Sequence, residues 1–328
     1  MSANRRLPSV SAVIPTRNRP ELVSRAARSA LGQSYASLEV IVVVDGPDPA
    51  TAQVLEALGD SRLRIVALAE NVGGSEARNI GVREAKGEWI ALLDDDDEWL
   101  PQKIDRQIAA ICADNREIVF SATRYFDNRG SKKSIEPRRF PSPKQPICEY
   151  LFCETNRFGR RDCFLQTSTW MVRREFLLTH PFTVGLKKNQ DTDWLLRAFP
   201  QCAGQSAFVA EPLATFHRQP GIQRISTTRD WEYTFQWVEG NRRLFTPRAR
   251  AFVFMTECAR SANRQGAGLR TILFLWKQCD RAAKRSPKLV FCMGIALLHW
   301  LACFARRRPR TSLSDRMTPA ATMPAKVE

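Results

Sequence analysis

Four consecutive aspartates, Asp94, Asp95, Asp96 and Asp97, directly follow the apolar run at residues 89–93. Adjacent carboxylates repel one another, so this arrangement is costly in a folded domain unless a cation offsets the charge. A hard divalent cation such as Mg2+ or Mn2+ takes oxygen ligands and is commonly bound together with phosphate groups. The pattern therefore predicts a metal and diphosphate site at the carboxyl end of a sheet strand, where open α/β sheets bind ligands. A solvated acidic turn is the alternative.

The first third of the chain alternates strand and helix patterns. The predicted strands lie at 10–14, 39–44, 63–68 and 89–93, and the predicted helices at 21–31, 51–58, 76–85 and 101–115. The run at 39–44 is rich in valine and continuously apolar after its first residue, as in a parallel strand buried on both faces. This repeated pattern predicts an α/β fold with a doubly wound, mostly parallel sheet flanked by helices.

The middle of the chain is less regular. Short strands are predicted at 118–125, 166–172, 207–210 and 213–216, a helix at 191–199, and a mobile loop rich in proline, lysine and arginine at 127–146. Beyond Trp231 the pattern is helical and basic, without recurring strands. We therefore expect one domain over residues 1–230 and a basic helical extension over 231–328, with a disordered tail after Pro309.

The chain is strongly basic, with 50 lysines and arginines against 34 aspartates and glutamates and a net charge of +16. The excess suits a polyanionic partner, and its concentration late in the chain favours an anionic membrane surface. No nucleic-acid-binding motif accompanies it, so we expect no nucleic-acid partner. The nine cysteines include no Cys-x-x-Cys pair and no zinc-ligand spacing, which indicates reduced thiols in a cytosolic protein.

The segment at 289–305 has no charged side chain, and basic residues flank it on both sides. It is shorter than the roughly twenty residues that a spanning helix needs, and the positive-inside rule ordinarily makes the two flanks differ. We therefore expect a helix that lies in the membrane interface, with a true span and a buried core helix as alternatives. The apolar stretch after Arg6 is too short for a signal peptide. These features predict a cytoplasmic protein peripherally associated with the cytoplasmic face of the membrane.

Several short motifs occur in order along the first hundred residues. They are VIPTRNR at 13–19, VVDG at 43–46, NVGGSEARNIG at 71–81, GEWI at 87–90, and the aspartate run with Glu98 and Trp99. Together they resemble the family-2 glycosyltransferases of the GT-A fold, and a looser resemblance extends to about residue 226. The resemblance implies a GT-A-type sheet, a nucleotide-binding half at 1–105 and an acceptor half at 106–230.

The first two motifs offer contacts to a nucleotide. Pro15 ends the first strand, and Thr16 and Arg17 lie in the loop that follows, where backbone amides and the guanidinium face the sheet edge. A plain strand-to-helix turn is the alternative. The resemblance implies that Asp45, after the second strand, accepts a hydrogen bond from a uracil-like base or a ribose hydroxyl. Asp45 also fits the role of a turn-forming aspartate.

The third and fifth motifs offer contacts to the diphosphate. Gly74 and its neighbour allow close backbone approach ahead of a helix, and Arg78, one turn into that helix, is a candidate contact for the diphosphate or base, or else a surface arginine. By resemblance, Asp94 meets the ribose side and Asp96 ligates a Mn2+ or Mg2+ ion that bridges the diphosphate. The role of Asp95 is less defined, because the extra aspartates leave the register open by one position.

The second constellation lies at 189–194. The resemblance implies that Asp191 is the general base that deprotonates the attacking hydroxyl, with Asp193 as the second candidate. Gln190 replaces the glutamate usual in this family. Carboxylates placed for the helix dipole are the alternative. Arg218 is a candidate for offsetting diphosphate charge, and His217 is a candidate metal ligand or a structural histidine.

The leading hypothesis is a metal-dependent, inverting glycosyltransferase that uses a nucleotide-diphosphate sugar, most simply a UDP-sugar. Its acceptor would be a saccharide or lipid-linked saccharide, in cell-surface polysaccharide or glycolipid biosynthesis. The alternatives are a catalytically inactive glycosyltransferase-like membrane-binding protein, a sugar nucleotidyltransferase, and a non-catalytic binding module. The nucleotidyltransferase is disfavoured because residues 15–18 lack the glycine-rich loop that such enzymes carry after the first strand.

Overall fold

The computed structural model describes residues 7–130, 132–153, 163–218 and 230–307. Its strands are β1 (Val10–Thr16), β2 (Leu38–Val44), β3 (Leu63–Ala67), β4 (Trp89–Leu92), β5 (Glu98–Trp99), β6 (Phe120–Arg129), β7 (Lys132–Glu136), β8 (Trp170–Arg173) and β9 (Ser206–His217). Within the described residues these strands form one sheet in the order β3-β2-β1-β4-β8-β6-β9-β5, with β7 paired to β6.

The helices around the sheet follow the predicted alternation. They are α1 (Pro20–Leu31), α2 (Pro49–Glu56), α3 (Gly74–Glu84), α4 (Lys103–Ala113), α5 (Ile147–Cys153), α6 (Arg174–Thr179), α7 (Gln190–Arg197) and α8 (Phe199–Cys202), with the 3-10 turns η1 (Thr167–Thr169) and η2 (Ala203–Gln205). The helix predicted at 191–199 is therefore divided between α7 and α8.

The sheet is parallel in its first half and mixed in its second. β1 pairs in parallel with β2 and β4, and β2 pairs in parallel with β3, because helices connect these strands. β8 pairs antiparallel with β4 and β6, whereas β9 runs parallel to β6 and antiparallel to β5. The predicted α/β fold is confirmed, and its mostly parallel character holds for β1 to β4.

Two apolar layers cover the sheet. Every residue of β2 except Glu39 is buried, as the valine-rich run predicts for a strand covered on both faces. One layer lies between the sheet and α1, α2 and α4, and the other lies against α3 and α7. Because both faces are covered, the free edge for ligands is the carboxyl end of the parallel strands.

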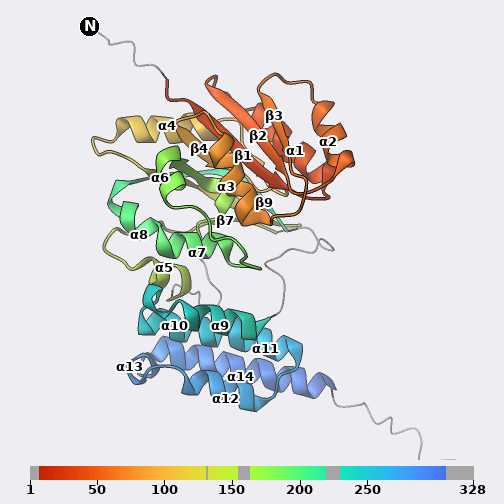
Figure 1. Cartoon of the computed structure of the whole chain (residues 1–328). Coiled ribbons are helices and arrows are strands. Elements are labelled where there is room, and N and C mark those ends of the chain that lie inside the picture. Colours follow the sequence, from red (N-terminus) through yellow and green to blue (C-terminus); the bar gives the residue numbers. More distant parts are fainter. Residues whose placement is uncertain (1–6, 131, 154–162, 219–229, 308–328) are drawn as a thin grey trace, which may run out of the picture.

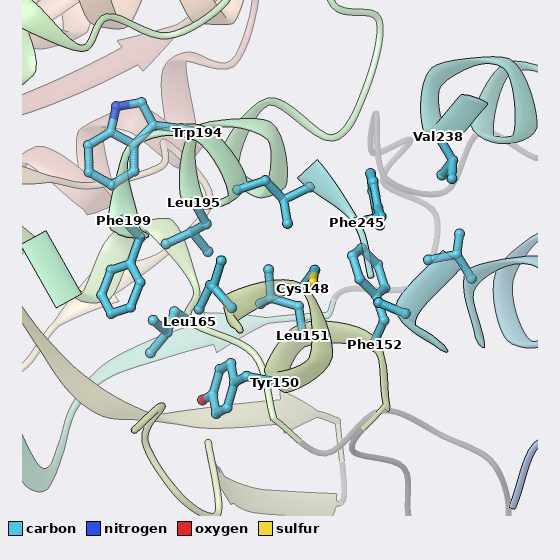
Figure 2. Close-up of a cluster of buried hydrophobic side chains, with 14 of the residues drawn as sticks. Cys148, Tyr150, Leu151, Phe152, Leu165, Trp194, Leu195, Phe199, Val238 and Phe245 are labelled. Atoms are coloured by element: carbon cyan, nitrogen blue, oxygen red, sulfur yellow. The ribbon is translucent and has the colours of Figure 1, made fainter. Parts of the chain in front are cut away.

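Only helices follow residue 230 in the described part of the chain. They are α9 (Trp231–Gly240), η4 (Arg242–Leu244), α10 (Pro247–Val253), the π-helical turn η5 (Phe254–Cys258), α11 (Ala259–Gln265), α12 (Leu269–Lys277), α13 (Arg281–Lys284) and α14 (Pro287–Arg307). Figure 1 shows this helical region as a stack below α5 and α7. The apolar layer against α7 continues into it; Figure 2 shows Phe152 of α5 beside Phe245, with ring centroids 5.7 Å apart. The division at residue 230 stays a prediction.

The structure corrects the predictions at 127–146 and 207–216. The loop predicted at 127–146 begins instead as a ribbon, because β6 continues to Arg129 and pairs antiparallel with β7. β7 tolerates its lysines since it is an edge strand with mostly exposed side chains. The strands predicted at 207–210 and 213–216 are one strand, β9, whose register against β6 shifts at Arg124.

The strand predicted at 166–172 begins only at Trp170. The preceding residues form η1, where the Gln166 side chain accepts a hydrogen bond from the Ser168 amide. Local side-chain bonding of this kind competes with strand pairing.

The apolar segment at 289–305 lies within α14. One face of this helix packs into the core through Leu289, Cys292 and Ala296, while Phe291 and Leu298 are exposed. No helix in the described ranges combines the length and hydropathy of a membrane span. The predicted tail after Pro309 lies outside the described residues.

Candidate active site

A cleft of about 1140 Å3 opens at the carboxyl edge of β1, β2 and β4. Its walls come from the loops after these strands, the start of α3, the segment that leads into α7, and the helices α9 to α11. All ten predicted site residues line it, namely Pro15, Thr16, Arg17, Asp45, Gly74, Arg78, Asp94, Asp95, Asp96 and Asp191. The fold therefore brings both sequence constellations to one cleft.

Asp45 holds the glycine loop in place. The amides of Val72 and Gly73 donate to its two carboxylate oxygens at 2.7 and 3.0 Å. Gly73 has a φ of +85°, a conformation that glycine adopts without steric cost, and α3 begins at the next residue. Because each carboxylate oxygen can accept more than one hydrogen bond, Asp45 keeps capacity for a ligand in the cleft.

Arg78 is the central cation of the cleft. Its Nη2 donates to Asp94 Oδ1 at 2.6 Å, and its Nη1 donates to Gln190 Oε1 at 3.0 Å and to the Gly74 carbonyl at 3.1 Å. The side chain is only 13% exposed, so these contacts are charge-assisted bonds in a partly desolvated site. Arg78 thus links the end of β4 to the start of α7.

Asp95 and Asp96 share a second arginine. Asp95 accepts hydrogen bonds from the Thr16 hydroxyl at 2.9 Å and from Arg19 Nη1 at 3.0 Å. Arg19 Nη1 also lies 3.7 Å from Asp96 Oδ2. Burial raises the pKa of Asp95 to about 6; Arg19 opposes this shift, and Asp96 and Asp94 add to it. The ionised form of Asp95 is therefore disfavoured at this position, chiefly by burial.

Asp97 plays a different part from the other three aspartates. It is fully buried and does not line the cleft. Its Oδ2 accepts from Gln166 Nε2 at 2.6 Å and from the Ser168 hydroxyl at 2.7 Å, and its Oδ1 accepts from the His217 amide at 3.3 Å. This geometry presents Asp94, Asp95 and Asp96 to the cleft and uses Asp97 to hold the strand end.

The start of α7 sets the position of Asp191. Asn189 adopts the left-handed conformation with a φ of 66°, so the chain turns sharply into the helix. Asp191 Oδ1 accepts from the Thr192 amide at 2.7 Å. The second candidate, Asp193, is buried and accepts from Thr183 and Arg197 at 2.7 and 2.8 Å. It is absent from the cleft lining, which leaves Asp191 as the candidate base in that wall.

His217 and Arg218 separate at the end of β9. His217 Nε2 lies 2.7 Å from Glu98 Oε1, and this histidine does not line the cleft. Arg218 lines the cleft and donates to Asp127 Oδ1 at 2.7 Å. Burial opposes ionisation of Asp127, but hydrogen bonds from Arg129 and Arg218 lower the pKa of this carboxyl below its ordinary value.

Sequence reasoning missed several cleft residues. Arg19 lies within the first motif and was identifiable as a partner for the aspartate run. Gln166 carries no such signal, because it reaches Asp97 across 69 positions of the chain. The same holds for Arg260 and Arg264 of α11, which the fold of the helical region brings to the cleft.

The donor set fits a cation that binds together with phosphate. Among the described residues, no group of three His, Cys, Asp or Glu side chains is arranged to hold a metal ion alone. Mg2+ and related hard cations are usually held by one or two carboxylates plus waters and substrate phosphates. The adjacent Asp95 and Asp96, with their shared arginine, match this kind of site.

Comparisons with known proteins identify the family of the chain. The model of glycosyl transferase family 2 matches residues 11–178. The succinoglycan biosynthesis protein ExoO of Rhizobium meliloti is 38% identical over 232 residues, which cover 67% of this chain and 64% of ExoO. The amylovoran biosynthesis glycosyltransferase AmsB of Erwinia amylovora is 29% identical over 249 residues, or 73% of this chain and 80% of AmsB. The chain thus spans slightly less than two thirds of ExoO.

Two solved structures share the fold. TarS 1-349 of S. aureus, in complex with UDP-GlcNAc, superposes with a TM-score of 0.57 and 15% identity over 92% of this chain and 91% of TarS. The mannosyltransferase PcManGT of Pyrobaculum calidifontis, in complex with GDP-Man and Mn2+, gives a TM-score of 0.53 and 16% identity over 92% and 87%. The chain belongs to glycosyl transferase family 2, and the predicted family, GT-A fold and enzyme class are confirmed. The nucleotidyltransferase alternative is set aside.

The different environments of Asp97 and Asp96 predict different effects of their substitution on stability. Asp97→Ala leaves the Gln166 and Ser168 donors buried without their acceptor, so we expect the free energy of unfolding to fall by about 2–4 kcal/mol. Asp96→Ala removes one of three adjacent charges, so we expect a change within about 0.5 kcal/mol or a gain. Urea denaturation followed by tryptophan fluorescence measures both. Equal losses in the two variants would contradict the assignment.

Proposed function

We propose that the protein transfers a sugar from a nucleotide-diphosphate sugar, most simply a UDP-sugar, to an acceptor hydroxyl with inversion at the anomeric carbon. One observation carries this proposal. The aspartates after β4 and Asp191 at the start of α7 line the same cleft, and Arg78 bridges the two walls through Asp94 and Gln190. Inversion needs a single base and a stabilised leaving group; in this cleft Asp191 is the candidate base, and the aspartate run with Arg78 is the candidate site for the leaving group.

The donor would lie along the carboxyl edge of the sheet. Pro15, Thr16 and Arg17 would meet the nucleoside from the loop after β1, while Asp45 would accept from the base or ribose. Gly74 would leave room for close backbone approach at the N-terminus of α3, where anions are favoured.

The diphosphate would lie between Arg78 and the aspartate run. Arg78, which contacts Asp94, would also pair with the diphosphate. Asp94 and Asp95 would face the ribose side. Asp96 would ligate Mn2+ or Mg2+. Such a cation, when bound, would supply positive charge to the departing diphosphate. PcManGT was solved with GDP-Man and Mn2+. This supports a divalent cation and leaves a GDP-sugar as the alternative to a UDP-sugar.

Asp191 would accept the proton of the attacking hydroxyl. The Thr192 amide fixes one of its carboxylate oxygens, and Gln190 beside it is neutral. The amide oxygen of Gln190 accepts from Arg78, so the replacement of the family's usual glutamate retains a contact across the cleft. This contact favours an active enzyme over a catalytically inactive glycosyltransferase-like protein.

The acceptor would be a saccharide or lipid-linked saccharide of a cell-surface polysaccharide or glycolipid. ExoO and AmsB are named for succinoglycan and amylovoran biosynthesis. WfaP of Escherichia coli, 32% identical over 117 residues, is named as a glucosyltransferase acting on GlcNAc-diphosphoundecaprenol. The lipid-linked acceptor named for WfaP supports an acceptor at a membrane surface.

The helical region offers a face for an anionic membrane. α14 exposes Val290, Phe291, Leu298 and Leu301, and the adjacent α12 exposes Leu273 and Phe274. Arg270 and Lys277 are exposed beside the apolar side chains of α12. Apolar side chains rimmed by basic residues suit the headgroup region of anionic lipids. We therefore include peripheral association with the cytoplasmic membrane face in the proposal.

Nucleotide binding is expected to depend on the metal. We expect one of UDP, GDP, dTDP and CMP, with UDP foremost, to raise the melting temperature in the presence of Mn2+, because a ligand of the native state stabilises it by mass action. The shift should disappear without Mn2+ and in Asp96→Ala. A well-folded sample that responds to none of the four would contradict the proposed donor class.

Asp191→Asn is expected to remove the base without disturbing the donor site. We expect kcat to fall by about 10²–10⁴-fold while the donor KM stays near that of the native protein. Asp193→Asn should affect stability more than turnover, because Asp193 does not line the cleft. Steady-state transfer assays with a radiolabelled sugar donor measure both. A larger loss of turnover in Asp193→Asn would reverse the assignment.

Membrane association is expected to depend on the exposed face of α14. The protein should sediment with vesicles rich in phosphatidylglycerol and less with neutral vesicles, and salt should weaken the association. Phe291→Glu with Leu298→Glu should abolish sedimentation. Leu178→Glu, at an exposed leucine of α6, is the control that should retain it. Unchanged sedimentation of the double variant would exclude this face.

A further inference from the structure

The two sides of the cleft differ in charge. We define the sheet side as the lining residues contributed by the strands, their loops and α3, and the helical side as those contributed by residues 186–192 and by α9, α10, η5 and α11. Among the described lining residues, the sheet side has five arginines against six carboxylates, namely Arg17, Arg19, Arg78, Arg129 and Arg218 against Asp45, Asp94, Asp95, Asp96, Asp127 and Glu136. This balance suits a cation accompanied by a diphosphate.

The helical side has the opposite balance. Its described lining residues include four cations against two carboxylates, namely Lys187, Lys188, Arg260 and Arg264 against Asp191 and Glu257. The proposed base lies on this side, so these cations line the same side of the cleft as the proposed acceptor site. A net positive wall attracts and orients an anionic ligand.

The cations of α11 point to the cleft because the other face of the helix is packed. Ala259, Ala262 and Asn263 are buried, and the Asn263 amide donates to the Ala296 carbonyl of α14 at 2.8 Å. Arg260 and Arg264 are four residues apart, so they lie on one face of the helix. The packing against α14 therefore fixes which face the cleft receives.

The turn before α11 is also unusual. η5 is π-helical, a geometry that is rare and occurs mostly at functional sites. It carries Glu257, which lines the cleft three residues before Arg260. Ser261, which follows Arg260 in α11, also lines the cleft.

Lys188 lies on the same side of the cleft as α11, in the segment that leads into α7. Its Nζ donates to the Asp230 carbonyl at 2.7 Å and lies 5.3 Å from the centroid of the Tyr233 ring. An ammonium group has three donors, and the Asp230 carbonyl uses one of them. Burial lowers the pKa of Lys188, while Asp230 and Glu257 oppose the shift, which places the Lys188 ammonium within the electrostatic reach of η5.

We propose that Lys188, Arg260 and Arg264 form an anion subsite on the helical side of the cleft that binds an oxyanion carried by the acceptor. The oxyanion is either the diphosphate that links a saccharide to a lipid or the carboxylate of an acidic sugar. The subsite rests on the proposed glycosyl transfer. It gives the helical region a role in acceptor selection in addition to membrane contact.

Equilibrium binding of small probes tests the subsite separately from catalysis. The probes are hexyl diphosphate, hexyl glucuronide and neutral hexyl glucoside, titrated by calorimetry into protein saturated with UDP and Mn2+ so that the donor site is blocked. We expect at least one anionic probe to bind about tenfold more tightly than hexyl glucoside. Arg264→Ala and Lys188→Ala should each weaken that probe about tenfold. The anionic probe that binds identifies the source of the oxyanion.

Arg243→Ala is the matched control, because Arg243 is an exposed arginine of the helical region outside the cleft lining; it should leave every probe affinity unchanged. Equal binding of the neutral and anionic probes, no binding of either anionic probe, or an equal loss in Arg243→Ala would overturn the subsite. UDP affinity, measured with the same samples, separates the two proposals. Loss of UDP binding in the native protein would count against the proposed function, whereas intact UDP binding without anion preference would count against the subsite alone.

Discussion

The arrangement of the cleft depends on three adjacent carboxylates that are partly or fully buried at the end of β4. Burial and neighbouring charge raise the pKa of Asp95 to about 6, which corresponds to about 3 kcal/mol against its ionised form. Arg19 reduces this cost, Arg78 pairs with the neighbouring Asp94, and Asp97 fixes the backbone through buried hydrogen bonds. The cost of ionising these carboxylates is the physical reason to place a cation there, and that cation would attract a diphosphate.

Arg78 extends this constraint to the acceptor wall. Because one guanidinium contacts both Asp94 and Gln190, the position of α7 is tied to the charge state of the strand end. A diphosphate that drew Arg78 away from Asp94 would also change the contact of Arg78 with Gln190, the residue before Asp191. The two cleft sides also differ in charge. The carboxylates of the donor site need a cation, whereas the helical side presents cations of its own.

The sequence predicts the strand ends well, because their residues lie next to strong local patterns. Asp45 and Asp94 each follow a buried apolar run, so their meeting at one sheet edge follows from the parallel order of β1, β2 and β4. Gln166 and Arg264 were not predictable, because long-range packing alone brings them to the cleft. β7 was misread as a loop, since its lysines suit an exposed edge strand as well as a turn. The assignment of each site residue to a ligand stays a prediction.

The most direct test is the anomalous scattering of manganese in crystals of the protein grown with UDP and Mn2+. The account predicts one strong anomalous peak within coordination distance of the Asp96 carboxylate, with nucleotide density between Asp45 and Arg78. A peak at another set of ligands, or bound nucleotide without a peak near the aspartate run, would contradict the claim that this strand end holds the metal.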